Sequence, residues 1–168
     1  DIFLIKYNTS GAIQWTKQLG TSSEDVGYGV AGNSNNIYVT GYTKGNLGSV
    51  SNSGNSDIFL VKYYDNSTYQ STRLLGSSSA EVGRKVTVDS SNNLYVTGDN
   101  SSTSGDYDAF LAKYGSSGSP SNTPTWVRYM RTTSGEYGYG VVVNPDSHIY
   151  AVGNTGGELD NNTNSGLQ

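Results

Sequence analysis

The sequence of 168 residues contains no cysteine, one methionine, three prolines and one histidine. Without cysteine the chain has neither disulfide bonds nor thiolate metal ligands. The single histidine, His148, follows Pro145 and Asp146 in a segment expected to form an exposed turn. This position argues against a Ser-His-Asp triad, and one histidine excludes a metal site built from several imidazoles.

Basic stretches and long apolar runs are lacking too. The ten Lys and Arg residues are scattered among 14 acidic residues, and the formal net charge is −4. A nucleic-acid surface needs concentrated positive charge, and a transmembrane helix needs about 18 or more consecutive apolar residues. The sequence therefore predicts no nucleic-acid partner and no membrane span.

The residues that are abundant are those of strands and turns. Hydrophobic residues make up only 33% of the chain, whereas glycine occurs 22 times and tyrosine 14 times. Ile, Val, Phe, Tyr and Thr gather in short runs that are separated by clusters of Gly, Asn and Ser. This pattern predicts an all-β protein with many polar turns.

Four sequence blocks recur three times in an unchanging order. The block DIFLIKY at 1–7 recurs at 57–63 and 108–114, and WTKQLG at 15–20 recurs at 71–76 and 126–131. The block DVGYGV at 25–30 recurs at 81–86 and 136–141, and NIYVTG at 36–41 recurs at 93–98 and 148–153. Four strands in a repeat of about 50 residues predict the blade of a β-propeller. The repeat units are 1–56, 57–107 and 108–168.

The pattern within the blocks predicts the order of strands in a blade. The glycine-rich GYGV block suits the crowded strand beside the central axis. The WTKQLG block is polar on one face and suits the outermost strand, with NIYVTG and then DIFLIKY between the two. Each blade is then a four-stranded antiparallel sheet. The whole blades span about 24–76 and 81–131, and complementary half-blades span 1–20 and 136–153.

These blocks carry a family resemblance. The patterns D-(A/I)-F-L-x-K-Y, W-T-x-x-L-G, a carboxylate before G-x-G-V, and Y-V-T-G resemble the SBBP-type bacterial and archaeal β-propeller repeat over nearly the whole chain. The third copy departs from the pattern, with Met130-Arg131 for Leu-Gly and Ala151-Val152 for Val-Thr. The resemblance implies an exported or surface-attached propeller without a defined activity.

The two half-blades predict how the chain meets its partners. Three repeat units fall below the four to eight blades of closed propellers, and pairing the half-blades would remove exposed sheet edges. We expect either further blades of a longer chain or other copies of the chain to complete them. Assembly from copies could close into a six-bladed ring or continue as a filament.

Two sets of residues are candidates for a binding site. Asp25, Glu81 and Glu136 recur at one position of the repeat. One interpretation is a carboxylate collar at the mouth of the propeller channel. The other is that each carboxylate accepts backbone hydrogen bonds where the chain crosses between blades. The less regular tyrosines lie near long variable loops and could stack on sugars. These tyrosines are Tyr28, Tyr42, Tyr107 and Tyr137.

Acidic residues elsewhere give weaker indications. Asp1, Asp57 and Asp108 recur at the start of one strand and are expected to be structural. Only Asp106 and Asp108 approach the alternating acids of a calcium loop, so no cofactor is expected beyond a weak possibility of calcium. A glycosidase pair is conceivable from Glu24 and Asp25, or from Glu158 and Asp160. Because adjacent acids in polar loops are usually solvated, no catalytic residue is assigned.

The sequence thus predicts a non-catalytic extracellular or cell-surface module that serves as a structural, assembly or adhesion scaffold. The alternative is a propeller that binds carbohydrate or protein through its long variable loops. The absence of cysteine fits an exported protein, and four N-x-S/T sequons agree weakly with a glycosylated surface. The sequons begin at Asn8, Asn66, Asn100 and Asn161.

Overall fold

The computed structural model describes residues 1–101, 105–116, 123–160 and 162. Its described residues form twelve strands. The first six are β1 (Ile2–Tyr7), β2 (Ile13–Leu19), β3 (Asp25–Gly32), β4 (Asn36–Thr43), β5 (Asp57–Tyr64) and β6 (Tyr69–Leu75). The others are β7 (Glu81–Val88), β8 (Leu94–Ser101), β9 (Tyr107–Tyr114), β10 (Trp126–Met130), β11 (Glu136–Val143) and β12 (Ile149–Thr155).

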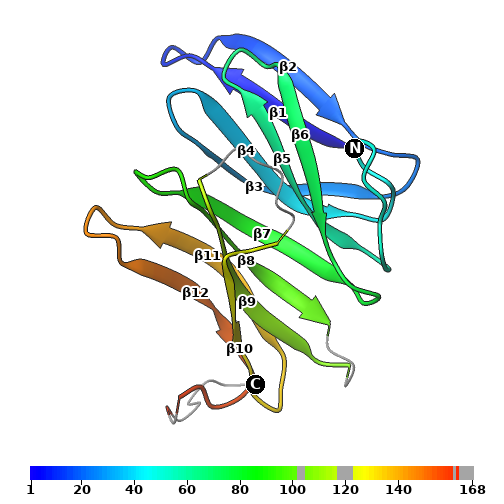
Figure 1. Ribbon diagram of the computed structural model, residues 1–168, viewed down its shortest axis with the longest axis vertical. Coiled ribbons are helices and arrows are strands. Elements are labelled where there is room, and N and C mark those ends of the chain that lie inside the picture. Colours follow the sequence, from blue (N-terminus) through cyan, green and yellow to red (C-terminus); the bar gives the residue numbers. More distant parts are fainter. Residues whose placement is uncertain (102–104, 117–122, 161, 163–168) are drawn as a thin grey trace.

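The strands form four antiparallel sheets that follow one another through the molecule (Figure 1). Two sheets have four strands, in the orders β3-β4-β5-β6 and β7-β8-β9-β10. The other two have two strands, β1-β2 and β11-β12, and lie at opposite ends of the molecule. The predicted all-β fold of four-stranded antiparallel sheets with two-stranded sheets is confirmed. We call the two-stranded sheets half-blades.

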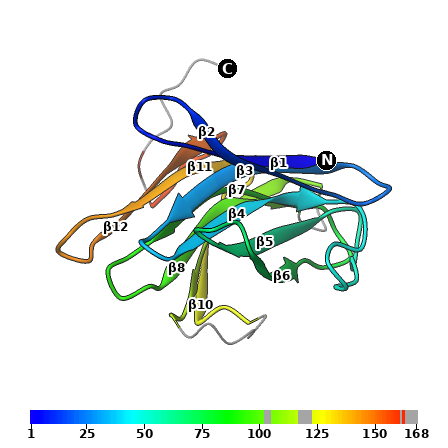
Figure 2. The ribbon, with the colours of Figure 1, turned by 90° about the horizontal axis from the view of Figure 1, so that it is seen from above.

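The sheets are arranged as a fan. The inner strand β7 contacts both β3 and β11, whereas β6 and β10 lie on the opposite side of the molecule (Figure 2). The inner strands are rich in glycine, and a Cβ on Gly83 would stand 2.4 Å from Thr40 Oγ1 of the neighbouring sheet. The strands can approach this closely because these positions carry no side chain.

Two apolar clusters hold neighbouring sheets together. One lies between the two four-stranded sheets and includes Ile58, Val96 and Phe110. The other joins the β1-β2 half-blade to the first four-stranded sheet and includes Ile2 and Phe59. Strands β4, β5 and β8 are buried on both faces, as expected for sheets stacked between neighbours.

Each inner strand contains one irregularity at the same place. The pairing register shifts between Gly27 and Gly29 in β3, between Gly83 and Lys85 in β7, and between Gly138 and Gly140 in β11. In each case one extra residue lies in the inner strand, which is a β-bulge. The extra residues are Tyr28, Arg84 and Tyr139. A bulge interrupts the alternation of side chains between the two faces of a strand, so the side chain of the extra residue points in a different direction. These three redirected side chains determine where the candidate site lies.

The described part of the chain contains no helix that is long and apolar enough to cross a membrane.

Candidate functional site

The three recurring acids close the loops between successive sheets. Asp25, Glu81 and Glu136 are all buried, and each accepts a hydrogen bond from the backbone N–H of the residue four positions earlier. The same residue's hydroxyl also donates to the carboxylate. Burial raises the pKa of Glu81 above its ordinary value; the two hydrogen bonds from Ser77 lower it, and the charge of Asp57 raises it. Each carboxylate therefore closes its loop by accepting a backbone hydrogen bond, whereas the role of the three acids in binding stays a prediction.

A second recurring acid, Asp57, is buried with one oxygen unpaired. Its side chain is 1% exposed, Oδ2 accepts the Ser53 N–H at 2.8 Å, and Oδ1 accepts no hydrogen bond from the described residues. A Cβ on Gly76 would stand 2.1 Å from Oδ1, so any larger residue there would require the Asp57 carboxylate to move. In the third repeat Arg131 replaces that glycine, and its Nε donates to Asp108 at 2.7 Å.

Asp57 makes the stability of the fold depend on pH. Burial raises the pKa of this carboxyl, and the hydrogen bond from Ser53 opposes the shift. A raised pKa means that folding favours the protonated form, so this contribution to stability is complete below about pH 4 and is lost as the pH rises through the folded-state pKa. We expect Asp57→Asn, which imitates the protonated carboxyl, to gain stability relative to the wild type between pH 4 and pH 7. Urea unfolding across this range measures the difference.

The exposed Asp146→Asn variant is the control for that experiment, and we expect a smaller change in its difference from the wild type. If the Asp57→Asn difference stayed constant with pH, the raised pKa would be contradicted.

The acids considered as catalytic pairs are exposed, except for Asp25. Glu24 is exposed and accepts hydrogen bonds from Lys44 and Tyr42, and these contacts lower the pKa of Glu24. Its neighbour Asp25 is buried in the loop contact described above. Glu158 and Asp160 are exposed. Among the described residues, no group of three or more His, Cys, Asp or Glu side chains could hold a metal ion.

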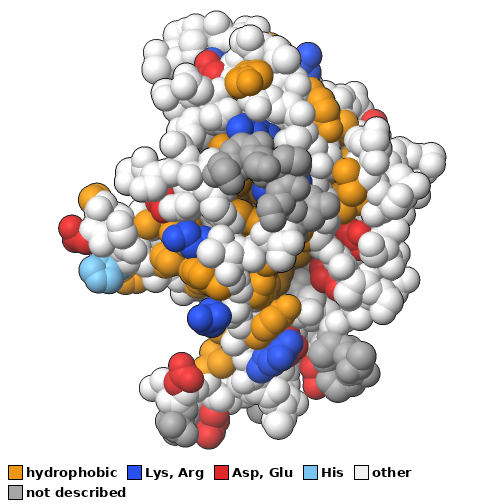
Figure 3. Space-filling view, viewed as in Figure 1, with side chains coloured by type: hydrophobic (Ala, Val, Ile, Leu, Met, Phe, Trp, Pro, Cys, Tyr) orange, Lys and Arg blue, Asp and Glu red, His pale blue; other side chains and the backbone are white. Residues whose placement is uncertain are grey.

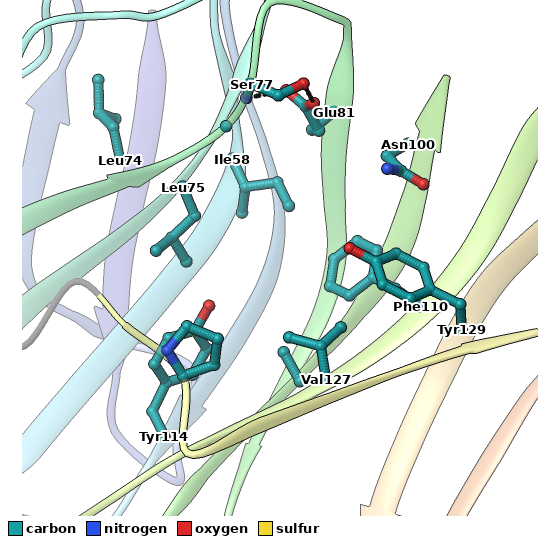
Figure 4. Close-up of a pocket in the computed structure, with 13 residues that line it drawn as sticks. Ile58, Leu74, Leu75, Ser77, Glu81, Asn100, Phe110, Tyr114, Val127 and Tyr129 are labelled. Atoms are coloured by element: carbon teal, nitrogen blue, oxygen red, sulfur yellow. Dashed lines mark hydrogen bonds between the residues drawn. The ribbon is translucent and has the colours of Figure 1, made fainter. Parts of the chain in front are cut away.

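A cavity of about 420 Å³ opens between the outer strands of the two four-stranded sheets. Figure 4 shows Leu75 and Ile58 facing Tyr114 and Val127 across it. Apolar side chains also gather in the centre of this face of the molecule (Figure 3). At the equivalent place beside the β1-β2 half-blade the cavity measures about 10 Å³. The cavity is smaller there because Val61 stands at the position that Ala112 has in the second four-stranded sheet, and valine is larger than alanine. The fully buried Leu47 also packs into the same cluster.

The four tyrosines singled out in the sequence lie in one array, together with two residues that the sequence did not indicate. Arg84 lies over the rings of Tyr28 and Tyr139, at 5.7 Å and 5.2 Å from their centroids. Tyr42 extends the array beyond Tyr28, with ring centroids 6.1 Å apart. We call this set, which also contains Tyr137 and Tyr107, the tyrosine–arginine array.

The far end of the array is built by stacked rings. Tyr137 and Tyr139 stack with an interplanar angle of 9°, and the rings of Tyr107 and Tyr137 have centroids 5.3 Å apart. The array extends from the first four-stranded sheet to the β11-β12 half-blade, because Tyr28, Arg84 and Tyr139 are the three bulge residues of the inner strands. The signal in the sequence was the G-x-G/K pattern, whose middle residue is Tyr, Arg and Tyr in turn.

The charges within the array are paired locally. Arg84 forms a partly buried ion pair with Asp99. Burial raises the pKa of Asp99, and the hydrogen bond from Arg84 lowers it. At the other end Tyr42 donates a hydrogen bond to Glu24, which raises the pKa of Tyr42 to about 12, with a smaller contribution from burial. Lys44 compensates the charge of Glu24.

Each half-blade has one strand edge that is paired in the complete sheets but pairs with no strand of the described residues here. Strand β1 pairs only with β2, and β12 pairs only with β11. In the complete sheets, the equivalent strands pair with each other, β4 with β5 and β8 with β9. A groove of about 460 Å³ runs between β1 and β3, and one of about 130 Å³ lies between β12, β8 and β9.

The half-blades also expose apolar residues that are buried in the complete sheets. Phe3 is 75% exposed, whereas Phe59, at the same position of the next repeat, is 0% exposed. Tyr7 and Tyr150 are exposed, although Tyr63 and Tyr38 at their positions are buried. The outward faces of the half-blades therefore have the composition of an interface between blades.

Comparison with known families identifies the repeat. The family model described as the SBBP beta-propeller repeat matches residues 14–48 and 72–107. The fold and these matches define a β-propeller repeat protein. The two matched segments are similar to SBBP repeats, as the resemblance of the sequence blocks indicated. No curated protein matches the chain.

Proposed function

We propose that this protein is a non-catalytic propeller module that assembles by completing its half-blades with strands of a second copy. Strand β12 of one copy would pair with β1 of the other, producing a four-stranded sheet in the order β11-β12-β1-β2. The observation that carries the proposal is the equivalence of these two free edges to the paired edges of β4 and β5.

The repeat predicts the register of the new pairing. Gly41 pairs with Phe59 in the first sheet, and Gly98 pairs with Phe110 in the second. Gly153 occupies the corresponding position in β12, so it would pair with Phe3 of the second copy. In both complete sheets the phenylalanine ring lies close to this glycine, at 2.8 Å and 3.1 Å from an added Cβ. The groove beside Gly153 is the place that the ring of Phe3 would take.

The same pairing would cover the groove beside β1. Strands β11 and β12 of the second copy would lie against β3, as the equivalent strands β3 and β4 lie against β7. Burying the exposed Phe3, Tyr7 and Tyr150 would stabilise the contact by about 1.5–3 kcal/mol for each fully buried side chain. This pairing is heterologous, so two copies could close into a ring or further copies could continue the series.

We further propose that the module acts outside the cell or on its surface. The lack of cysteine supports this, and so do two sequons that lie on exposed hairpins, Asn8 and Asn66. Asn100 has a buried amide oxygen and offers a poorer acceptor, and Asn161 lies outside the described residues. Expression in a glycosylating secretory host, followed by mass spectrometry, is expected to find glycan at Asn8 and Asn66.

Cysteine cross-linking of the 168-residue chain tests the assembly, because the chain has no cysteine of its own. The register places Ala151 opposite Ile5 of the second copy, since Val39 lies opposite Val61. Directly opposed residues in antiparallel strands have Cα atoms about 4.5–5.5 Å apart, within the reach of a disulfide. We expect the double variant I5C/A151C to form disulfide-linked multimers under oxidation.

The matched control is L4C/A151C, whose first cysteine points to the other face of the new sheet. Sedimentation of the wild type would show a discrete two-chain species for a ring, or a series of larger species for an open assembly. A chain that is monomeric at every concentration, or equal cross-linking of the two double variants, would refute the proposed pairing.

A further inference from the structure

We propose that the tyrosine–arginine array is a binding site for a neutral saccharide. The array lies on the inner strands and not on the free edges of β1 and β12, so this proposal does not depend on assembly. It also differs from the expectation that a ligand would be held by the long variable loops.

The first support is the exposure and flatness of the array. Tyr28 is 50% exposed and Tyr139 is 49% exposed, and both belong to strands that are fixed in the sheets. The planar guanidinium of Arg84 lies over both rings. Glycines flank each of the two tyrosines in the inner strands, so their neighbours along the chain carry no side chain that could cover them. The result is a platform of flat groups in place of an enclosed pocket.

The second support is the chemistry of that platform. The face of a tyrosine ring carries partial negative charge, and the C–H groups on one side of a sugar ring carry partial positive charge. The two surfaces can therefore stack. The hydroxyls of the sugar would meet the phenolic hydroxyls, which donate and accept hydrogen bonds at the edges of the rings, and the N–H groups of Arg84, which donate them.

The pairing of charges selects a neutral ligand. Asp99 balances Arg84, and Lys44 balances Glu24, so neither end of the array carries a large uncompensated charge. An anionic ligand would have to compete with the Asp99 carboxylate, which is already in contact with Arg84. Protein partners usually anchor side chains in enclosed, desolvated pockets, and the half-exposed tyrosines form an open platform instead.

The third support is that the array departs from the repeat. The bulge position is Tyr in the first and third inner strands and Arg in the second. The residue on the adjacent strand changes with it, from Tyr42 beside Tyr28 to Asp99 beside Arg84. If these residues served only to pack neighbouring blades together, the same residue type would suffice at this position in every repeat. The differing residues combine into a single asymmetric surface.

Affinity electrophoresis in gels that contain a neutral polysaccharide tests the site. The probes are hydroxyethylcellulose, xyloglucan, mannan, dextran and laminarin, with polygalacturonate as the anionic comparison. We expect retardation by at least one neutral polymer. We expect Tyr28→Ala and Tyr139→Ala each to weaken it by at least about five-fold, because each removes one stacking surface. Tyr139→Phe retains the ring and should retain binding.

Tyr64→Ala is the matched control, because Tyr64 is 47% exposed on β5 and lies outside the array. Its binding should equal that of the wild type. The proposal is overturned if no neutral polymer retards the chain, if only polygalacturonate does so, or if the alanine variants of the array bind as well as Tyr64→Ala. Circular dichroism of each variant shows that a loss of binding is not a loss of fold. Failure here would leave the cross-linking result unaffected.

Discussion

Replacing Gly41 with alanine is expected to destabilise the protein more than any surface substitution. A Cβ on Gly41 would stand 1.9 Å from the carbonyl oxygen of Val26 and 2.8 Å from the ring of Phe59. The carbonyl belongs to the β3–β4 ladder beside the bulge and cannot move without breaking the pairing. We expect a loss of about 3 kcal/mol in the free energy of unfolding and a fall of roughly 10 °C in Tm.

Gly115→Ala is the control for this prediction, since the nearest atom to its added Cβ is Thr125 Oγ1 at 3.9 Å. Its stability should remain within about 0.5 kcal/mol of the wild type. The same crowding exists at Gly98, where the Val82 carbonyl oxygen is 1.9 Å from an added Cβ. Equal stability of Gly41→Ala and Gly115→Ala, measured by urea unfolding, would show that the strands can separate to accept a methyl group.

The sequence was sufficient to predict the sheets because each strand occurs three times. The block NIYVTG ends on Gly41, Gly98 and Gly153 in its three copies, and the crowding at the first two explains why the repeat requires glycine there. The alternation of polar and apolar residues then indicated which strand is outermost. The sequence repeat made the glycines and the strand order predictable, because equivalent strands pack against equivalent neighbours in every blade.

The candidate site was only partly predictable, for two physical reasons. First, Arg84 and Tyr139 join the array because a bulge redirects them, and a one-residue insertion in a strand cannot be recognised from alternation alone. Second, Tyr7 and Tyr150 are exposed, although the tyrosines at the same positions of another repeat, Tyr63 and Tyr38, are buried. Their exposure follows from their position in the half-blades. Exposure at such a position depends on which sheets lie beside the half-blade, and not on the residues of the half-blade itself.

Phe3 and Phe59 provide the sharpest comparison, because the same residue at the same position of the repeat should respond in two different ways. Phe59 is fully buried in the cluster beside the first half-blade. We expect Phe59→Ala to lower the free energy of unfolding by about 4 kcal/mol, from lost burial and the cavity that remains. We expect Phe3→Ala to change the stability of the monomeric chain by less than about 0.5 kcal/mol.

The effect of Phe3→Ala should appear in association instead. Burying a phenylalanine side chain contributes about 1.5–3 kcal/mol, so its removal should weaken association of the copies by roughly ten-fold or more. Urea unfolding at low concentration and sedimentation at high concentration separate the two effects. If Phe3→Ala lowered the stability of the monomer as strongly as Phe59→Ala, the outer face of β1 would already be packed within its own chain. If it changed neither stability nor association, Phe3 would not be an interface residue, and a strand other than β12 of a second copy would have to complete the half-blade.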